Sequence, residues 1–150
     1  MRTWLKNTNL IDGTGAPARA GGLVIEGETI VHAGPLSAAD APSGADTDVL
    51  DLGGRTVIPG LVEAHIHLSY NNVKVIADLD LNCPLEAITC ATRHGAELMR
   101  MPDRIGTLAA GKLADLVVVD GDPLKDIAVL QDRSRLSVMK GGRFVTRNLS

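Results

Sequence analysis

The sequence contains few aromatic residues and few cysteines. The aromatic residues among its 150 positions are Trp4, Tyr70 and Phe144, so a core has to be built from Val, Leu, Ile and Ala. Cys83 and Cys90 are seven positions apart and fit neither a CxxC pair nor a zinc-knuckle spacing. On one helix they would lie about 10 Å apart along the axis, too far for a disulfide. We therefore expect two small buried side chains.

Long apolar runs and basic runs are also missing. No stretch approaches the roughly 18 apolar residues of a membrane span, and the first residues lack the apolar segment of a signal peptide. The formal net charge is −3, which argues against nucleic acid or an anionic membrane as partner. Because 45% of the residues are hydrophobic, the chain can fill a core. These features predict a folded cytoplasmic protein.

Short β-rich segments separated by glycine and proline occupy both ends of the chain. Glycine-containing turns between such segments predict three hairpins, over residues 23–32, 49–58 and 136–146. Further strands are predicted over residues 3–10 and 114–120. Between the ends, residues 61–68 fit a buried strand, and residues 84–100 fit a helix with proline in its first turn and Asn82 as N-cap. Residues 73–81 fit helix and strand equally.

The pair His65 and His67 is the most suggestive chemical feature. Residues two apart on a strand point to the same side, so both imidazoles could bind one divalent metal ion. A catalytic zinc needs at least one more protein ligand and an open position for water. Two strand histidines with ordinary hydrogen bonds would show the same spacing, so the pair alone does not decide between these alternatives.

Longer motifs around this pair resemble the amidohydrolase superfamily, nearest to its imidazolonepropionase and prolidase-like members. Residues 57–67, VIPGLVEAHIH, resemble the family's v-i-P-G-l-i-D-x-H-x-H stretch, the first strand of a (β/α)₈ barrel. Residues 10–15 and the following glycine hairpins resemble the first half of the family's small β-sandwich. Residues 103–124, DRIGTLAAGKLADLVVVDGDPL, resemble the returning half.

The resemblance implies a metal-dependent hydrolase for carbon–nitrogen bonds. A divalent metal, in the first instance zinc, would be bound by His65, His67 and later ligands and would activate water for attack on an amide or dipeptide-like small molecule. Glu63 stands where the family usually has aspartate. Imidazole ligands suit iron, nickel and cobalt as well. No residue of this chain matches the family's catalytic aspartate, so no catalytic residue is assigned.

The length of the chain conflicts with a complete barrel. A (β/α)₈ barrel needs about 250 residues, whereas the two sandwich halves are separated by residues 59–103. We therefore predict a mainly β fold with α. Residues 1–58 and 104–150 would form a composite β-sandwich, and residues 59–103 would be a remnant of the TIM-type barrel, its first strand and last helix. The remaining barrel would have been lost by an internal deletion near Cys83.

Seven other polar residues are of types that could replace the missing ligands. Each has a simpler structural explanation, as exposed histidines, a solvated face, or capping and turn residues; they are His32, His94, Asp78, Asp80, Asp115, Asp120 and Asp122. Three interpretations follow. The chain is an active amidohydrolase, a catalytically inactive remnant that binds metal weakly, or a module that self-associates as a homo-oligomer through its uncovered strand, residues 61–68.

Overall fold

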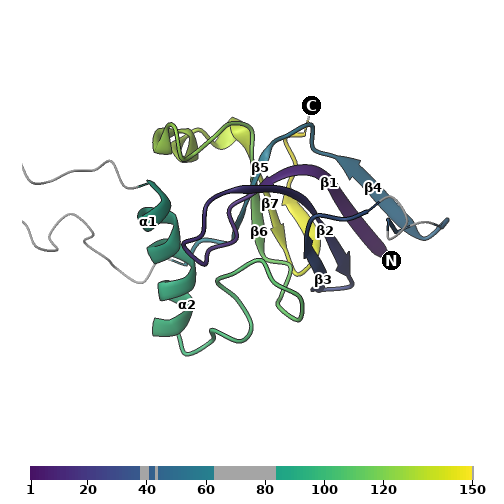
Figure 1. Cartoon of the computed structure of the whole chain (residues 1–150), viewed down its shortest axis with the longest axis horizontal. Coiled ribbons are helices and arrows are strands. Elements are labelled where there is room, and N and C mark those ends of the chain that lie inside the picture. Colours follow the sequence, from purple (N-terminus) through teal and green to yellow (C-terminus); the bar gives the residue numbers. More distant parts are fainter. Residues whose placement is uncertain (38–40, 43, 63–83, 150) are drawn as a thin grey trace, which may run out of the picture.

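The fold is dominated by β-strands, with a helix beside them (Figure 1). The computed structural model describes residues 1–37, 41–42, 44–62 and 84–149. Seven strands follow one another in the order β3-β2-β1-β5-β6-β7-β8, and β4 also pairs with β1. The strands are β1 (Arg2–Leu10), β2 (Arg19–Glu26), β3 (Thr29–Gly34), β4 (Thr47–Asp51), β5 (Thr56–Pro59), β6 (Leu116–Val119), β7 (Leu136–Lys140) and β8 (Arg143–Thr146).

The predicted helix is confirmed over most of its length, with an irregularity in its middle. It consists of α1 (Pro84–Thr89), the π-helical segment η3 (Cys90–His94) and α2 (Gly95–Leu98). Ile88 and Ala96 of this helix are fully buried, and Ile88 packs with Ile58 of β5 and Val119 of β6. The predicted N-cap Asn82 lies outside the described residues. Two short 3₁₀ helices, η4 (Ile127–Gln131) and η5 (Arg133–Arg135), lead into β7 and are each capped by an aspartate side chain.

The two ends of the chain share one sheet. β5 pairs with β6 in antiparallel register, with Thr56 opposite Val119 and Pro59 opposite Leu116. All residues of both strands are buried. The four-residue aliphatic run of β6 therefore reflects a strand covered on both faces.

The hairpin predicted over residues 49–58 is wrong. β4 and β5 do not pair with each other; both lie parallel to β1, one after the other along the same side. The glycines between them have positive φ angles, which suit a tight turn. However, backbone hydrogen bonds from Leu52 to Lys6 (2.9 Å) and from Gly54 to Asn7 (2.7 Å) keep the chain along β1. Burial of the Leu52 side chain favours this path over a reversal.

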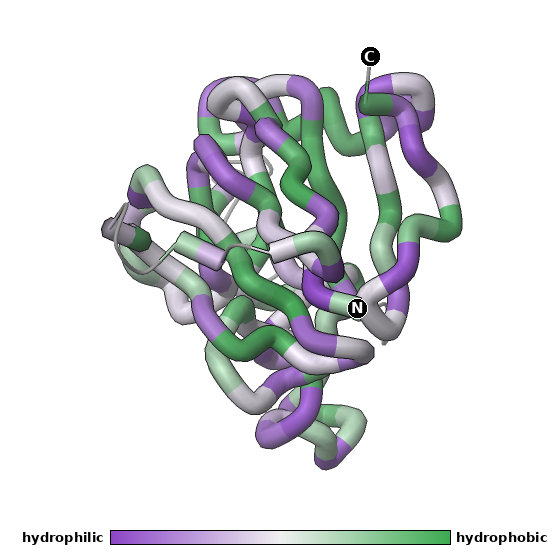
Figure 2. Tube along the Cα trace, turned by 90° about the vertical axis from the view of Figure 1, so that its right-hand side faces the viewer, coloured by the Kyte–Doolittle hydropathy of each residue, from purple (hydrophilic) through white to green (hydrophobic). Residues whose placement is uncertain are grey.

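Two aliphatic clusters form the core, and β6 contributes to both. Leu116 and Val118 belong to the larger cluster with Leu5, and Val117 and Val119 belong to a second cluster that includes Ile88 of α1. Neighbouring residues of a strand point to opposite faces, so β6 divides the two clusters. The hydrophobic stretches coloured green in Figure 2 follow several of these strands.

These observations support a sheet-dominated chain with few helices. The division into a composite sandwich (1–58 and 104–150) and a barrel remnant (59–103) stays a prediction. No helix in the described part of the chain is long and apolar enough to span a membrane.

Candidate functional site

The predicted metal ligands His65 and His67 lie outside the described residues, as do Glu63, Asp78 and Asp80. Val62 is the last described residue before these predicted ligands, and Pro84 is the first described residue after them. The candidate site is therefore built from the elements that hold these two points.

Backbone hydrogen bonds hold the chain at Gly60 and Val62. After β5, the Gly60 N–H donates to the carbonyl oxygen of Asp115 at 2.8 Å. Two residues later, the Val62 N–H donates to the carbonyl oxygen of Ala91 at 2.7 Å. Val62 is therefore bound directly to the helix that follows Pro84, although 21 residues, 63–83, lie between them.

The π-helical segment η3 allows the hydrogen bond between Val62 and Ala91 to form. In an α-helix the Gly95 N–H would bond to Ala91, four residues earlier. Here it bonds to the carbonyl oxygens of Cys90 and Thr92 instead. The Ala91 carbonyl accepts from Val62, which lies outside the helix. Single π-turns inside α-helices are frequent at functional positions.

Gly95 allows the helix to approach this closely. A Cβ atom at Gly95 would lie 2.8 Å from the Val62 Cβ and 2.9 Å from the Val62 carbonyl oxygen, closer than real Cβ atoms come. Any larger residue would push the helix and Val62 apart. A glycine inside a helical pattern costs helix stability, and such a position often has a packing reason.

The loop after β1 lies close to the same helix, because the Arg93 guanidinium donates to the Thr14 carbonyl oxygen at 3.1 Å. Gly13 has a φ of +83°, and a Cβ there would lie 2.6 Å from the Gly106 carbonyl oxygen. Next to it, the nearly buried Asp12 carboxylate accepts from the Thr14 N–H (2.9 Å) and hydroxyl (2.6 Å) and is ion-paired with Arg19. Burial acts to raise the pKa of Asp12, but these hydrogen bonds and Arg19 outweigh it and lower that pKa.

The other predicted candidates take structural roles. The His32 Nε2 lies 3.1 Å from the Pro35 carbonyl oxygen, at the end of β3. The Asp115 carboxylate accepts from the Gly141 N–H (2.7 Å), Asp122 accepts from the Leu124 N–H (3.0 Å), and Asp120 faces Arg55. Within the described ranges, no three His, Cys, Asp or Glu residues form a group that could hold a metal ion.

His94 is exposed, as predicted, but Cys90 differs from the prediction. The Cys90 side chain is half-buried rather than buried, and its Sγ lies 3.4 Å from the Nδ1 of His94. Neither this contact nor the contact of Gly95 with Val62 was predicted from the sequence. The i, i+4 spacing of Cys90 and His94 and the glycine inside a helix were the available signals.

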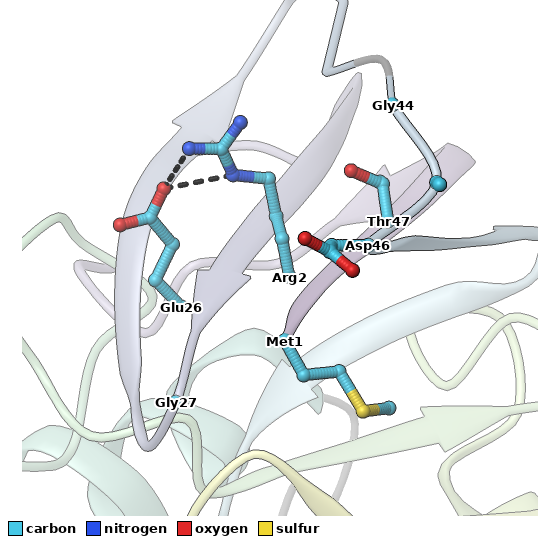
Figure 3. A pocket seen from close by; sticks show the side chains of 8 residues that line it. Met1, Arg2, Glu26, Gly27, Gly44, Asp46 and Thr47 are labelled. Carbon is cyan, nitrogen blue, oxygen red and sulfur yellow. Dashed lines mark hydrogen bonds and ion pairs between the residues drawn. The ribbon is translucent and has the colours of Figure 1, made fainter.

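A polar pocket of about 420 Å³ lies away from these elements, near the start of β1 (Figure 3). Its lining residues are Met1, Arg2, Glu26, Gly27, Gly44, Ala45, Asp46 and Thr47. The Arg2 Nε donates to Glu26 at 2.8 Å, so these two charges compensate each other inside the pocket. None of the residues that the sequence nominates as ligands lines it.

Comparison with solved structures defines the class of fold. An amidohydrolase crystal structure superposes with a TM-score of 0.78 at 11% sequence identity, covering 100% of this chain and 100% of that chain. At this identity the likeness concerns the fold. It places the chain among proteins with an amidohydrolase fold.

Sequence comparison extends this result to the family. The model of the amidohydrolase family matches residues 79–145. Imidazolonepropionase of Micrococcus luteus is 31% identical over 115 residues, covering 71% of this chain and 26% of that protein. N-acyl-D-glutamate deacylase of Alcaligenes xylosoxydans xylosoxydans is 45% identical over 58 residues, covering 39% of this chain and 11% of that protein. The chain belongs to the amidohydrolase superfamily, and its matches span between 11% and 27% of the length of its curated relatives.

Proposed function

We propose that this chain carries the metal-binding element of a hydrolase that acts on carbon–nitrogen bonds in small amide or dipeptide-like molecules, with His65 and His67 as two of the metal ligands. The family membership supports the reaction class, because its relatives include a deacylase and an imidazolonepropionase. The observation that carries the proposal is the position of Val62. It precedes His65 by three residues and is held to the helix by its hydrogen bond to Ala91.

The metal itself is proposed from the histidine pair alone. The described residues offer no three-ligand group that fits a catalytic metal. When bound, a divalent ion such as zinc polarises a carbonyl and acidifies water. In the described part of the chain, hydrogen bonds of Gly60 and of Val62, the latter to the helix that begins at Pro84, hold the backbone on both sides of the predicted ligands.

A second candidate function is a catalytically inactive module that binds metal weakly or self-associates. The observation that favours it is that β5 pairs directly with β6 while only residues 60–115 separate these two strands in the sequence. Eight strand–helix units need about 250 residues, so 56 residues cannot contain them. An internal deletion near Cys83 would explain this shortness, and the same deletion would have removed the further ligands and the catalytic aspartate.

One experiment separates the two candidates. Metal content and hydrolysis of a panel of N-acyl amino acids and dipeptides are measured for the full chain and for His65→Ala/His67→Ala. His32→Ala, which removes a histidine from the end of β3, is the matched control. Turnover that is lost in the double variant and kept in the control supports the hydrolase. Metal loss in the double variant without any turnover supports the inactive module. Metal content that is equal in all three proteins contradicts both assignments of His65 and His67.

A further inference from the structure

Cys90 and His94, two residues of metal-ligating types, lie in the helical segment between α1 and α2. They lie four residues apart, at the two ends of the π-helical segment η3. The Cys90 Sγ is 3.4 Å from the His94 Nδ1. Cys90 is half-buried and His94 is exposed, so the pair is accessible from the surface.

The distance between these two atoms matches the spacing of two ligands on one metal ion. Zinc bonds thiolate sulfur at about 2.3 Å and imidazole nitrogen at about 2.0–2.1 Å. At a tetrahedral angle, these lengths separate the two ligand atoms by about 3.5 Å. One cation could therefore bond both atoms without a change in the backbone. We propose that Cys90 and His94 form a two-ligand site for a borderline-soft divalent cation such as Zn²⁺, with water in the remaining positions.

The chemistry of the site follows from its neighbours. Binding breaks the Cys90 S–H bond, forms a bond from Sγ to the metal and releases the proton to solvent. Burial, together with the negative charge of Glu86, raises the pKa of Cys90, so the metal competes with a firmly held proton. Within the described residues no third His, Cys, Asp or Glu joins the pair. The site is therefore a modest chelator, weaker than a four-ligand structural zinc site.

Arg93 opposes metal binding in this arrangement. Its Nη2 lies 2.9 Å from the Nε2 of His94, and arginine can only donate. The Nε2 therefore carries the lone pair, and the proton of the neutral ring is on Nδ1, facing Cys90. A metal on Nδ1 requires this proton to move to Nε2, where it would point at the Arg93 N–H. The carbonyl oxygen of Thr14, 3.1 Å from the Arg93 Nη1, helps to hold the guanidinium in place.

Cobalt titration of the full chain tests the site, because cobalt bound to thiolate gives a charge-transfer absorption that histidine ligands alone do not give. We expect this absorption for the parent chain and for Cys83→Ser, the matched control. It should disappear in Cys90→Ser and require at least about tenfold more cobalt in His94→Ala. His65→Ala/His67→Ala should keep it, which separates this site from the proposed function. Circular dichroism confirms that each variant is folded.

Replacing Arg93 by glutamine tests whether Arg93 opposes metal binding by His94. In Arg93→Gln the amide oxygen can accept from Nε2–H, the partner that a metal-bound histidine requires. We expect about tenfold tighter cobalt binding. Arg104→Gln removes the same charge from an exposed turn and should leave the affinity within about twofold. Absence of the absorption in the parent chain, its loss in Cys83→Ser rather than Cys90→Ser, or unchanged or weaker binding by Arg93→Gln would overturn the proposal.

Discussion

Replacing Gly95 by alanine tests how the helix is held to Val62. Helix propensity alone predicts a gain of about 1 kcal/mol in the free energy of unfolding, since glycine is unfavourable inside a helix. The new Cβ would lie 2.8 Å from the Val62 Cβ and 2.9 Å from its carbonyl oxygen. Overpacking of this kind costs about 1–3 kcal/mol. Separation of the two segments would also lose the hydrogen bond from Val62 to Ala91, worth about 1 kcal/mol.

The sum of these terms is a net loss of about 1–3 kcal/mol for Gly95→Ala, and its sign is opposite to that of the propensity. Urea unfolding followed by circular dichroism measures it, and hydrogen exchange of the Val62 amide should become faster. Val62→Gly removes two of the three nearest atoms, so the double variant should recover part of the loss beyond additivity. A Gly95→Ala protein more stable than the parent by about 1 kcal/mol would refute the reasoning.

Two further predictions concern the sheet and the loop after β1. The Asp12 pKa lies below its usual value, so the ionised side chain stabilises the fold at neutral pH, and this share is lost as the pH falls through the folded-state pKa. The free energy of unfolding of Asp12→Asn should therefore be lower by about 1–2 kcal/mol at pH 7 and should change less at acid pH than that of the parent. Equal acid dependence of the two proteins would contradict this. Asp103→Asn, at an exposed position, is the control. Leu116→Ala, at a fully buried position of β6, should cost about 2–5 kcal/mol in urea unfolding, whereas Val145→Ala, 65% exposed on β8, should change stability by less than about 0.5 kcal/mol.

Local patterns predicted most of the strands and the helix, because turn glycines and hydrophobic periodicity act over a few residues. The turns at Gly27 and Gly141 both have positive φ angles and join antiparallel partners, as expected for their hairpins. Gly53 and Gly54 have similar angles, yet β4 and β5 do not pair. The same turn chemistry therefore led to two correct hairpins and one wrong one. The difference came from a non-local partner, β1, which the turn residues do not specify.

The candidate site also combines features that the sequence predicts with features that only the structure shows. The sequence by itself determined the family, the candidate ligands His65 and His67, and the shortage of residues for a barrel, since these depend on residue identity and number. Only the tertiary structure decided that Val62 is bound to Ala91, that Gly95 is required where Val62 approaches, and that Cys90 faces His94. These contacts depend on a π-turn and on a close approach of distant segments, and the backbone geometry behind them is set by packing rather than by any short sequence pattern.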